Sequence, residues 1–174
     1  MGEIGIRPAR RGEAGRIADI EVASIPKFHF LPGFERQFIG FVARPEKYLP
    51  YVEDGRAFVA VNEWDWPLGF CATDEMDDEA YLAELAVEVD HQGHGLGRRL
   101  VNTACDWARQ AGFTSILLST FRDVPWNAPY YARQGFRLLG SAELSKPGIK
   151  RQREHEAEFL DLNTRVFMRK SLTS

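Results

Sequence analysis

Three glycines, at positions 93, 95 and 97, lie in the stretch of sequence best suited to chemistry. They follow an apolar segment, residues 81–89, and they overlap the start of residues 96–111, where apolar side chains recur at helical spacing. Glycine lets a backbone turn tightly and bring several N–H groups close to a ligand. The first N–H groups of a helix lack partners within it and carry partial positive charge. We therefore predict that this loop binds a phosphate or pyrophosphate group.

The elements on either side of the loop have the patterns of a buried strand and an amphipathic helix. Residues 81–89 are apolar except for Glu84 and Glu88, which is typical of a largely buried strand. Residues 96–111 have an apolar face opposite a charged one, and Gly112 is well placed to end the helix. A strand, a glycine loop and a helix are thus expected in succession.

The spacing of the glycines distinguishes between classes of phosphate-binding loop. A nucleoside-triphosphate loop needs Gly-Lys followed by Ser or Thr, which does not occur here, and Gly93-x-Gly95-x-Gly97 lacks the last spacing of the dinucleotide fingerprint. The pattern that fits is Gln92-x-x-Gly95-x-Gly97 after a strand that carries Val87. It resembles the acyl-CoA pyrophosphate loop of the GNAT superfamily of N-acetyltransferases, which has Gln or Arg, then Gly three positions later, then Gly or Ala.

The order of the predicted elements extends this resemblance to nearly the whole chain. The acidic segment 74–79 is expected to connect two strands as a hairpin. Residues 24–34 are expected to form a loop or broken helix. The strand–helix–strand order after residue 81 is expected to give parallel pairing of the two strands. Further strands are predicted at 5–8, 56–62, 68–73, 113–120, 136–140 and 165–169, and further helices at 11–23, 34–42 and 127–135, with a helical piece in 141–162.

This order resembles the GNAT fold. The resemblance implies an α/β (α+β) fold with a mixed central sheet of about six or seven strands, flanked by helices and with splayed parallel strands in the middle. One N-acetyltransferase domain, residues 1–174, is expected because no linker or repeat is visible.

Composition narrows the class of protein further. The chain has 174 residues, of which 44% are hydrophobic and 27% charged, as in ordinary globular domains. Its net charge of −3 and its lack of a long basic run argue against a nucleic-acid partner, and no apolar run is long enough to cross a bilayer, so no membrane partner is expected. Cys71 and Cys105 are expected to be buried free thiols in a cytoplasmic protein.

Acyl transfer from a thioester to an amine needs a neutral amine, a polarised carbonyl and a proton for the leaving thiolate. The segment Tyr131-x-x-x-Gly135-Phe136 resembles the second signature of the family, whose tyrosine lies near the sulfur atom. The resemblance therefore implies that Tyr131 is the general acid, with Tyr130 as the alternative. A core tyrosine that packs a short helix is the purely structural interpretation of Tyr131.

Glu84 is the predicted base or water-positioning residue. A carboxylate on an otherwise apolar strand is costly unless it is solvated or paired, and the family often has an acidic residue on this strand. A salt-bridged or edge-facing Glu84 is an equally good structural interpretation, and Glu88 is the next candidate base.

The resemblance also implies which residues bind acetyl-CoA, the expected co-substrate. A backbone N–H near Val87 would meet the thioester carbonyl and act as an oxyanion site. Asn127 resembles the asparagine that meets the pantetheine arm, although its gap to Tyr131 is short and a helix-capping role is equally consistent. The predicted cofactor-binding residues are Leu85, Ala86, Val87, Val89, Gln92, Gly93, His94, Gly95, Leu96, Gly97, Arg98, Asn127 and Tyr131.

His91 and His94 form a His-x-x-His pair, but without a third ligand nearby they are a poor metal signal, and no metal is expected. The predicted function is transfer of an acetyl group from acetyl-CoA to a primary amine, on a small molecule rather than a protein, by direct attack. No pattern specifies the acceptor, and a homodimer is compatible with the family. The alternative is a non-catalytic acyl-CoA-binding sensor or partner module, and a nucleotide-dependent enzyme is a weaker rival.

Overall fold

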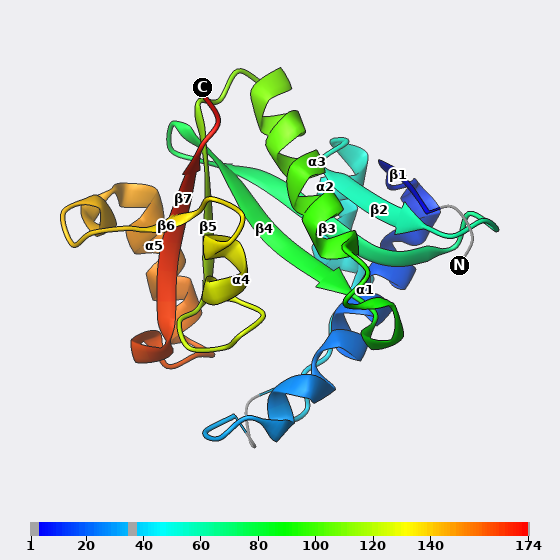
Figure 1. Ribbon diagram of the computed structural model, residues 1–174, viewed down its shortest axis with the longest axis horizontal. Coiled ribbons are helices and arrows are strands. Elements are labelled where there is room, and N and C mark those ends of the chain that lie inside the picture. The colour runs from blue at the N-terminus through cyan, green and yellow to red at the C-terminus, as the bar shows by residue number, and fades with distance from the viewer. Residues whose placement is uncertain (1–3, 35–37, 174) are drawn as a thin grey trace. The chain divides into compact units, whose positions relative to one another are not determined.

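The computed structural model describes residues 4–34 and 38–173. Seven strands form one mixed sheet in the order β1-β2-β3-β4-β5-β7-β6, and helices flank it, as predicted (Figure 1). The strands are β1 Gly5–Pro8, β2 Ala57–Val61, β3 Pro67–Met76, β4 Glu79–Val87, β5 Ser115–Phe121, β6 Arg137–Leu138 and β7 Arg165–Ser171. The helices are α1 Ala14–Ser24, α2 Pro45–Glu53, α3 Leu96–Gln110, α4 Ala128–Ala132 and α5 Pro147–Ala157.

Backbone contacts divide the chain into two compact units. The first comprises residues 1–73 and 84–104, and the second comprises residues 74–83 and 105–174. The expectation of a single domain therefore stays a prediction. No helix in residues 4–34 or 38–173 is long and apolar enough to cross a membrane.

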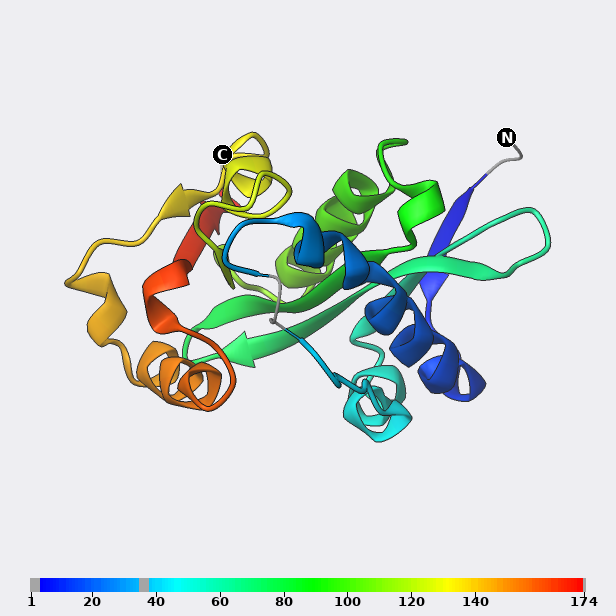
Figure 2. The same cartoon turned by 90° about the horizontal axis from the view of Figure 1, so that it is seen from below.

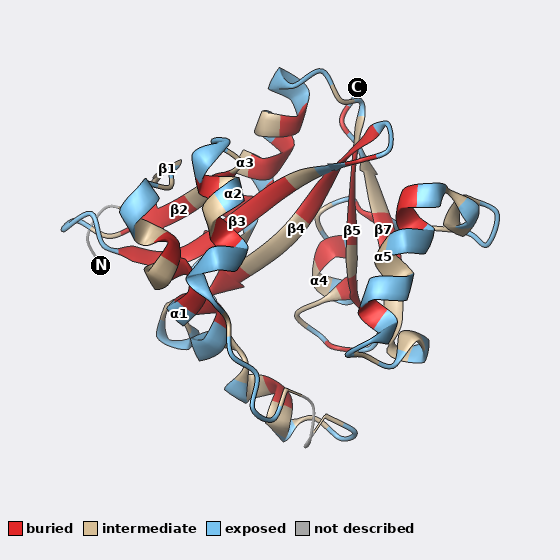
Figure 3. Ribbon diagram, turned by 180° about the vertical axis from the view of Figure 1, so that it is seen from behind, coloured by how far each residue is buried: buried red, intermediate tan, exposed pale blue. Residues whose placement is uncertain are grey.

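In the first unit, β1, β2 and β3 pair in antiparallel fashion, and α1 and α2 lie together on one side of them (Figure 2). The first part of α3 lies on the other side, where the Cys71 thiol donates a 3.5 Å hydrogen bond to the Leu100 carbonyl. Buried residues run along β2 and β3 (Figure 3). The core beneath α1 and α2 includes Ile17, Ile20, Tyr48, Val52, Val59, Phe70 and Ala86.

In the second unit, the start of β4 pairs in parallel with β5, with Ala80 opposite Ile116, which confirms the predicted parallel connection. β7 then pairs antiparallel with both β5 and β6. Its core includes Met76, Tyr81, Leu117, Ile149 and Phe167. Cys105 is a buried free thiol in this unit, as Cys71 is in the first, and both were predicted so.

The helix predicted over residues 34–42 is wrong. Residues 35–37 lie outside the described part of the chain, and residues 38–44 contain no helix. Phe38 and Gly40 have φ of 65° and 73°, which a right-handed helix does not allow. The helix α2 instead begins at Pro45, because proline is well suited to the first turn, where its missing N–H would have no helical partner.

The hairpin between β3 and β4 is tighter than predicted. β3 continues to Met76 and β4 begins at Glu79, so only Asp77 and Asp78 form the turn. Asp77 has φ of 54°, a conformation that Asp tolerates better than most residues. Glu79, predicted to lie in this connection, is buried and accepts hydrogen bonds from Arg169 at 2.6 and 2.8 Å.

Gly148 in α5 packs where no side chain fits. A Cβ atom there would lie 2.6 Å from Cγ of Met76 and 2.7 Å from Oδ2 of Asp77. We expect Gly148→Ala to lower the free energy of unfolding by about 1–3 kcal/mol, because neighbouring atoms must shift. Gly12→Ala is the matched control, since nothing lies within 4 Å of its added Cβ. Urea unfolding of both variants checks this, and equal stability of Gly148→Ala and the parent would contradict the packing.

Candidate functional site

The glycine loop between β4 and α3 has the backbone shape that the sequence predicts. β4 ends at Val87, a short turn of 3-10 helix follows at Val89–His91, and α3 begins at Leu96. Gly93 and Gly95 both have φ of 79°, the left-handed region that glycine enters without cost. Both are exposed, and any other residue at either position would strain the backbone.

Residues 93–98 present a row of free backbone N–H groups. Among the described residues, none of these six amides donates a hydrogen bond, and the first donor after them is Arg99, whose N–H binds the Gly95 carbonyl at 3.1 Å. The row includes the first turn of α3, where the helix dipole adds partial positive charge. Unpaired amides in this arrangement can bind an anion such as a phosphate group.

The side chain of Gln92 ties the loop to the end of β4. Its Nε2 donates a 2.7 Å hydrogen bond to the Val87 carbonyl, and its Oε1 accepts a 3.3 Å hydrogen bond from Nζ of Lys27. Gln92 therefore positions the loop through its side chain. Lys27 was not predicted as a member of this site, and its distance of 65 positions along the chain explains why no local pattern indicated it.

Arg98, the last residue of the row, and Arg99, the residue after it, differ in their side-chain contacts. Arg98 is exposed and makes no hydrogen bond or ion pair with any described residue, so its charge is available beside the loop. Arg99 donates a 2.7 Å hydrogen bond to the carbonyl of Ile4, the residue just before β1. Only Arg98 was predicted to bind cofactor, and its free guanidinium is compatible with that role.

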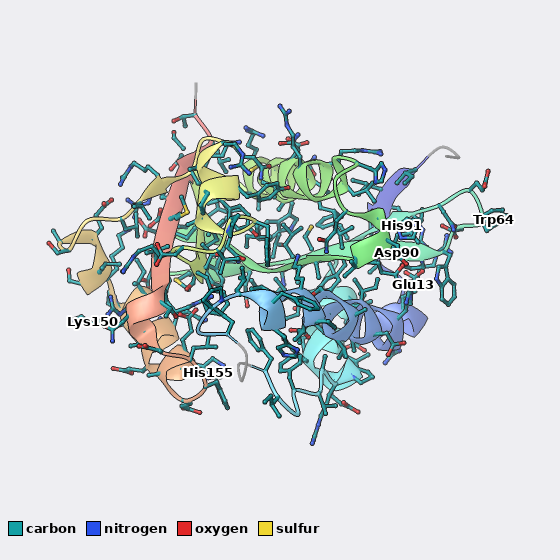
Figure 4. All side chains as sticks on the ribbon, turned by 60° about the horizontal axis from the view of Figure 1, so that its bottom comes forward. Glu13, Trp64, Asp90, His91, Lys150 and His155 are labelled. Carbon is teal, nitrogen blue, oxygen red and sulfur yellow. The ribbon has the colours of Figure 1, made fainter. Side chains whose placement is uncertain are left out.

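The two histidines of the loop differ in their surroundings. Asp90 and His91 lie just after the end of β4 (Figure 4). His91 is half-buried, with Nδ1 3.5 Å from a Glu88 carboxylate oxygen, while His94 is exposed. Glu88 also accepts a 2.6 Å hydrogen bond from Arg16, so the alternative base is already held by an ion pair. No group of three or more His, Cys, Asp or Glu suited to a metal occurs in residues 4–34 and 38–173.

The last residues of β4 lie unusually close to β3. A Cβ on Gly69 would lie 3.0 Å from the Ala86 carbonyl oxygen, a tighter contact than most Cβ atoms make, so a larger residue there would push the two strands apart slightly. Ala86 and Val87 are buried and Leu85 is half-buried, whereas Val89, beyond the strand, is exposed. The predicted cofactor-binding residues at the end of β4 are thus packed against β3 as far as Val87, where the strand ends.

Glu84 points into a charged cluster with α1 and α2. Lys47 Nζ lies 2.9 Å from Oε2 of Glu84 and 2.6 Å from Oε1 of Glu21, and the Tyr48 hydroxyl donates to the other oxygen of Glu21. The structure therefore contains the salt bridge that the sequence left open for Glu84. Burial raises the pKa of Glu84, and the Glu21 charge adds to this effect while Lys47 opposes it.

The other predicted site residues, Tyr131 and Asn127, belong to the second unit. Tyr131 is buried in α4, where its ring lies 5.3 Å from that of Tyr130 and 5.7 Å from that of Phe136. Asn127 occupies the N-cap position, but its side chain does not cap the helix. Its Nδ2 donates a 2.7 Å hydrogen bond to the Thr120 hydroxyl, and its buried Oδ1 has no partner among the described residues.

Comparison with protein families decides where this chain belongs. Residues 17–136 match the model of the Acetyltransferase (GNAT) family, which is more than half of the chain. The chain belongs to this family. The match contains the loop at residues 93–98 as well as Tyr131, so the resemblance seen in the sequence is confirmed.

Solved structures of GNAT acetyltransferases have a similar fold. N-acetylglutamate synthase from Neisseria gonorrhoeae, complexed with coenzyme A and N-acetyl-glutamate, matches with a TM-score of 0.72 and 19% identity over 100% of this chain and 36% of the synthase chain. This chain therefore spans only about a third of that protein. The PaiA N-acetyltransferase from Thermoplasma acidophilum, in complex with coenzyme A, matches with a TM-score of 0.71 and 15% identity over 97% and 99% of the two chains.

A third GNAT structure is named for a protein acceptor. The ribosomal-protein-S18-alanine N-acetyltransferase from Escherichia coli matches with a TM-score of 0.67 and 16% identity over 99% and 96% of the two chains. At these identities the similarity establishes the fold alone. It agrees with the fold class predicted from the sequence, and it does not distinguish between small-molecule and protein acceptors.

The partly buried position of Lys27 should make stability depend on pH. Burial lowers its pKa from 10.5 to about 8, so between these values the unfolded chain binds a proton that the folded chain does not. The free energy of unfolding therefore rises with pH across this window through Lys27. We expect the stability of the parent relative to Lys27→Met to increase from about pH 7.5 to about pH 10 in urea unfolding.

Lys150→Met, at an exposed lysine of α5 (Figure 4), provides the matched control for general effects of losing a positive charge. A stability difference between the parent and Lys27→Met that is the same at both pH values would contradict the partly buried ammonium.

Proposed function

We propose that this GNAT protein is an N-acetyltransferase that uses acetyl-CoA and transfers the acetyl group to the primary amine of a small molecule. The observation that carries the proposal is the row of free amides at residues 93–98, which lies in the loop whose Gln92-x-x-Gly95-x-Gly97 pattern resembles the family's coenzyme loop. A diphosphate fits these residues because unpaired N–H groups, a helix N-terminus and the free guanidinium of Arg98 all favour negative charge.

The family resemblance supplies the roles in the proposed reaction. Acetyl-CoA supplies an acetyl group activated as a thioester. Glu84 takes a proton from the amine, directly or through water, and a backbone N–H near Val87 meets the thioester carbonyl. As the new C–N bond forms and the C–S bond breaks, Tyr131 donates its phenolic proton to the departing thiolate.

The mechanism needs no covalent enzyme intermediate. Cys71 and Cys105 are buried in their cores, and burial raises the pKa of Cys105, which disfavours the thiolate that a nucleophile requires. Direct attack therefore depends on positioning of the two substrates and on stabilisation of charge. Residues 85–87, Gln92 and residues 93–98 would position the coenzyme, and Asn127 would meet its pantetheine arm.

The experiment that tests the function is release of free thiol from acetyl-CoA with a panel of amines. The panel contains L-glutamate, L-lysine, spermidine, kanamycin and a peptide with N-terminal alanine. We expect turnover with a small amine. Turnover of the peptide alone would overturn the small-molecule assignment, and binding of acetyl-CoA without turnover of any amine would favour the sensor function. Tighter binding of a nucleoside triphosphate or NAD than of coenzyme A would favour a nucleotide-dependent enzyme.

Gly95→Glu should abolish binding of coenzyme A. A side chain at a φ of 79° strains the loop, and a carboxylate beside the free amides repels phosphate. Asn102→Glu is the matched control, because it adds the same charge at an exposed position about two turns further along α3. Calorimetric titration with coenzyme A measures both variants. Comparable affinities of Gly95→Glu and Asn102→Glu would remove the loop from the coenzyme site.

Tyr131→Phe should lower kcat by about a hundredfold and leave the affinity for acetyl-CoA nearly unchanged, because only the proton donor is lost. Tyr130→Phe is the comparison variant, because Tyr130 is the alternative acid and its ring contacts that of Tyr131; we expect it to retain turnover. Steady-state kinetics and calorimetry give the two quantities. If Tyr131→Phe turns over as fast as the parent, Tyr131 is not the general acid.

A further inference from the structure

A cluster of charged groups in the first unit joins three elements around Glu84. Glu21 comes from α1, Lys47 and Tyr48 come from α2, and Glu84 comes from β4. Lys47 Nζ bridges the two carboxylates, at 2.6 Å from Glu21 and 2.9 Å from Glu84. We propose that Glu21 and Lys47 are positioning residues that hold the Glu84 carboxylate and set the pH at which it begins to accept protons from substrate.

The hydrogen bonds of the cluster leave one carboxylate oxygen available. Both oxygens of Glu21 are occupied, one by Lys47 and the other by the Tyr48 hydroxyl. Glu84 uses only Oε2, and its Oε1 accepts no hydrogen bond from any described residue. The Glu84 side chain remains 32% exposed, whereas that of Glu21 is 10% exposed. Glu84 is therefore the member of the cluster that can meet a substrate or a water molecule.

Two carboxylates share one ammonium in this cluster. Like charges at close range disfavour ionisation, whereas an opposite charge favours it. The titratable groups that face Glu84 are Glu21, Lys47 and Tyr48. The Tyr48 hydroxyl also donates a hydrogen bond to Glu21, and Tyr51 of α2 interacts with Tyr48. The pKa of Glu84 is raised by burial first and by Glu21 next, against the pull of Lys47.

A carboxylate with a raised pKa is a stronger base near neutral pH than an ordinary glutamate. Lys47 limits this effect and also fixes the Glu84 side chain, so that its free oxygen has a defined position. The inference rests on the proposed function, because only an enzyme that deprotonates an amine has a use for such a base. The arrangement of the cluster itself can be tested without any acceptor.

The first experiment measures the titration of Glu84 in the protein alone. The side-chain carboxyl carbons of 13C-labelled glutamate are followed by NMR against pH, and Glu84→Gln identifies the resonance. We expect Glu21→Gln to move the Glu84 midpoint to lower pH by about one unit, because a like charge is removed. We expect Lys47→Met to move it to higher pH by about one unit, because the opposing charge is lost.

The opposite directions distinguish electrostatic tuning from general damage to the fold. Glu21 is buried, so circular dichroism must first show that Glu21→Gln is folded. If Glu21→Gln is unfolded, the shift of the Glu84 midpoint in Lys47→Met, at the more exposed position, tests the proposal by itself. A midpoint that stays in place in Lys47→Met would overturn the proposal, as would a shift in the same direction in both folded variants.

The second experiment uses the panel amine that the parent turns over. Because the base acts when deprotonated, kcat/KM rises with pH through the pKa of Glu84. The acidic limb of the profile should move to lower pH in Glu21→Gln and to higher pH in Lys47→Met. A parent that turns over no amine would contradict the proposed function, while the NMR titration would still decide the tuning of Glu84. Turnover with an acidic limb that neither variant moves would overturn the positioning role alone.

Discussion

Backbone N–H groups at the start of a helix cannot be satisfied by that helix, and this constraint shapes the loop after β4. Residues 93–98 leave six N–H groups, three in the loop and three in the first turn of α3, without a partner among the described residues. Gly93 and Gly95 supply the left-handed backbone of the loop, and Gln92 fixes the loop to the carbonyl of Val87. An anion that accepts several of these hydrogen bonds at once is the ligand that such a site favours.

The two acidic residues of β4 illustrate how the number of donors decides the state of a buried carboxylate. Burial raises the pKa of Glu79, but hydrogen bonds from Arg169, Lys146 and Ser115 outweigh burial and lower it overall. Burial raises the pKa of Glu84, and the hydrogen bond from Lys47, which Glu84 shares with Glu21, does not outweigh burial. Glu79 is therefore suited to holding its unit together, while Glu84 retains an oxygen for chemistry.

The sequence predicted the strand, the glycine loop and α3 well because their signals are local. Apolar spacing, tight glycines and a helix N-terminus are read within about thirty residues, which is the length of one strand–helix unit. The helix predicted at 34–42 failed because aromatic spacing resembled a helical face, although Phe38 and Gly40 have positive φ. Because the helix was predicted at 34–42, Lys47 was not placed on a helix, and it could not be recognised from the sequence as the partner of Glu84.

Other features of the site could not be predicted because they depend on contacts between distant parts of the chain. Lys27 reaches Gln92 across 65 positions, and no periodicity records such a contact. For Asn127 the sequence left capping and ligand binding open, and the structure shows a side chain that bonds to Thr120 and does not cap. The assignments of Tyr131 and Glu84 as acid and base stay predictions.

The central claim, that the free amides of residues 93–98 bind the coenzyme diphosphate, is tested most directly by NMR of the 15N-labelled protein. Coenzyme A and pantetheine, which lacks the diphosphate, are titrated separately while the backbone amide resonances are followed. We expect the amides of residues 93–98 to shift strongly with coenzyme A and to stay in place with pantetheine. Amides of this loop that do not move while coenzyme A shifts resonances elsewhere would contradict the account.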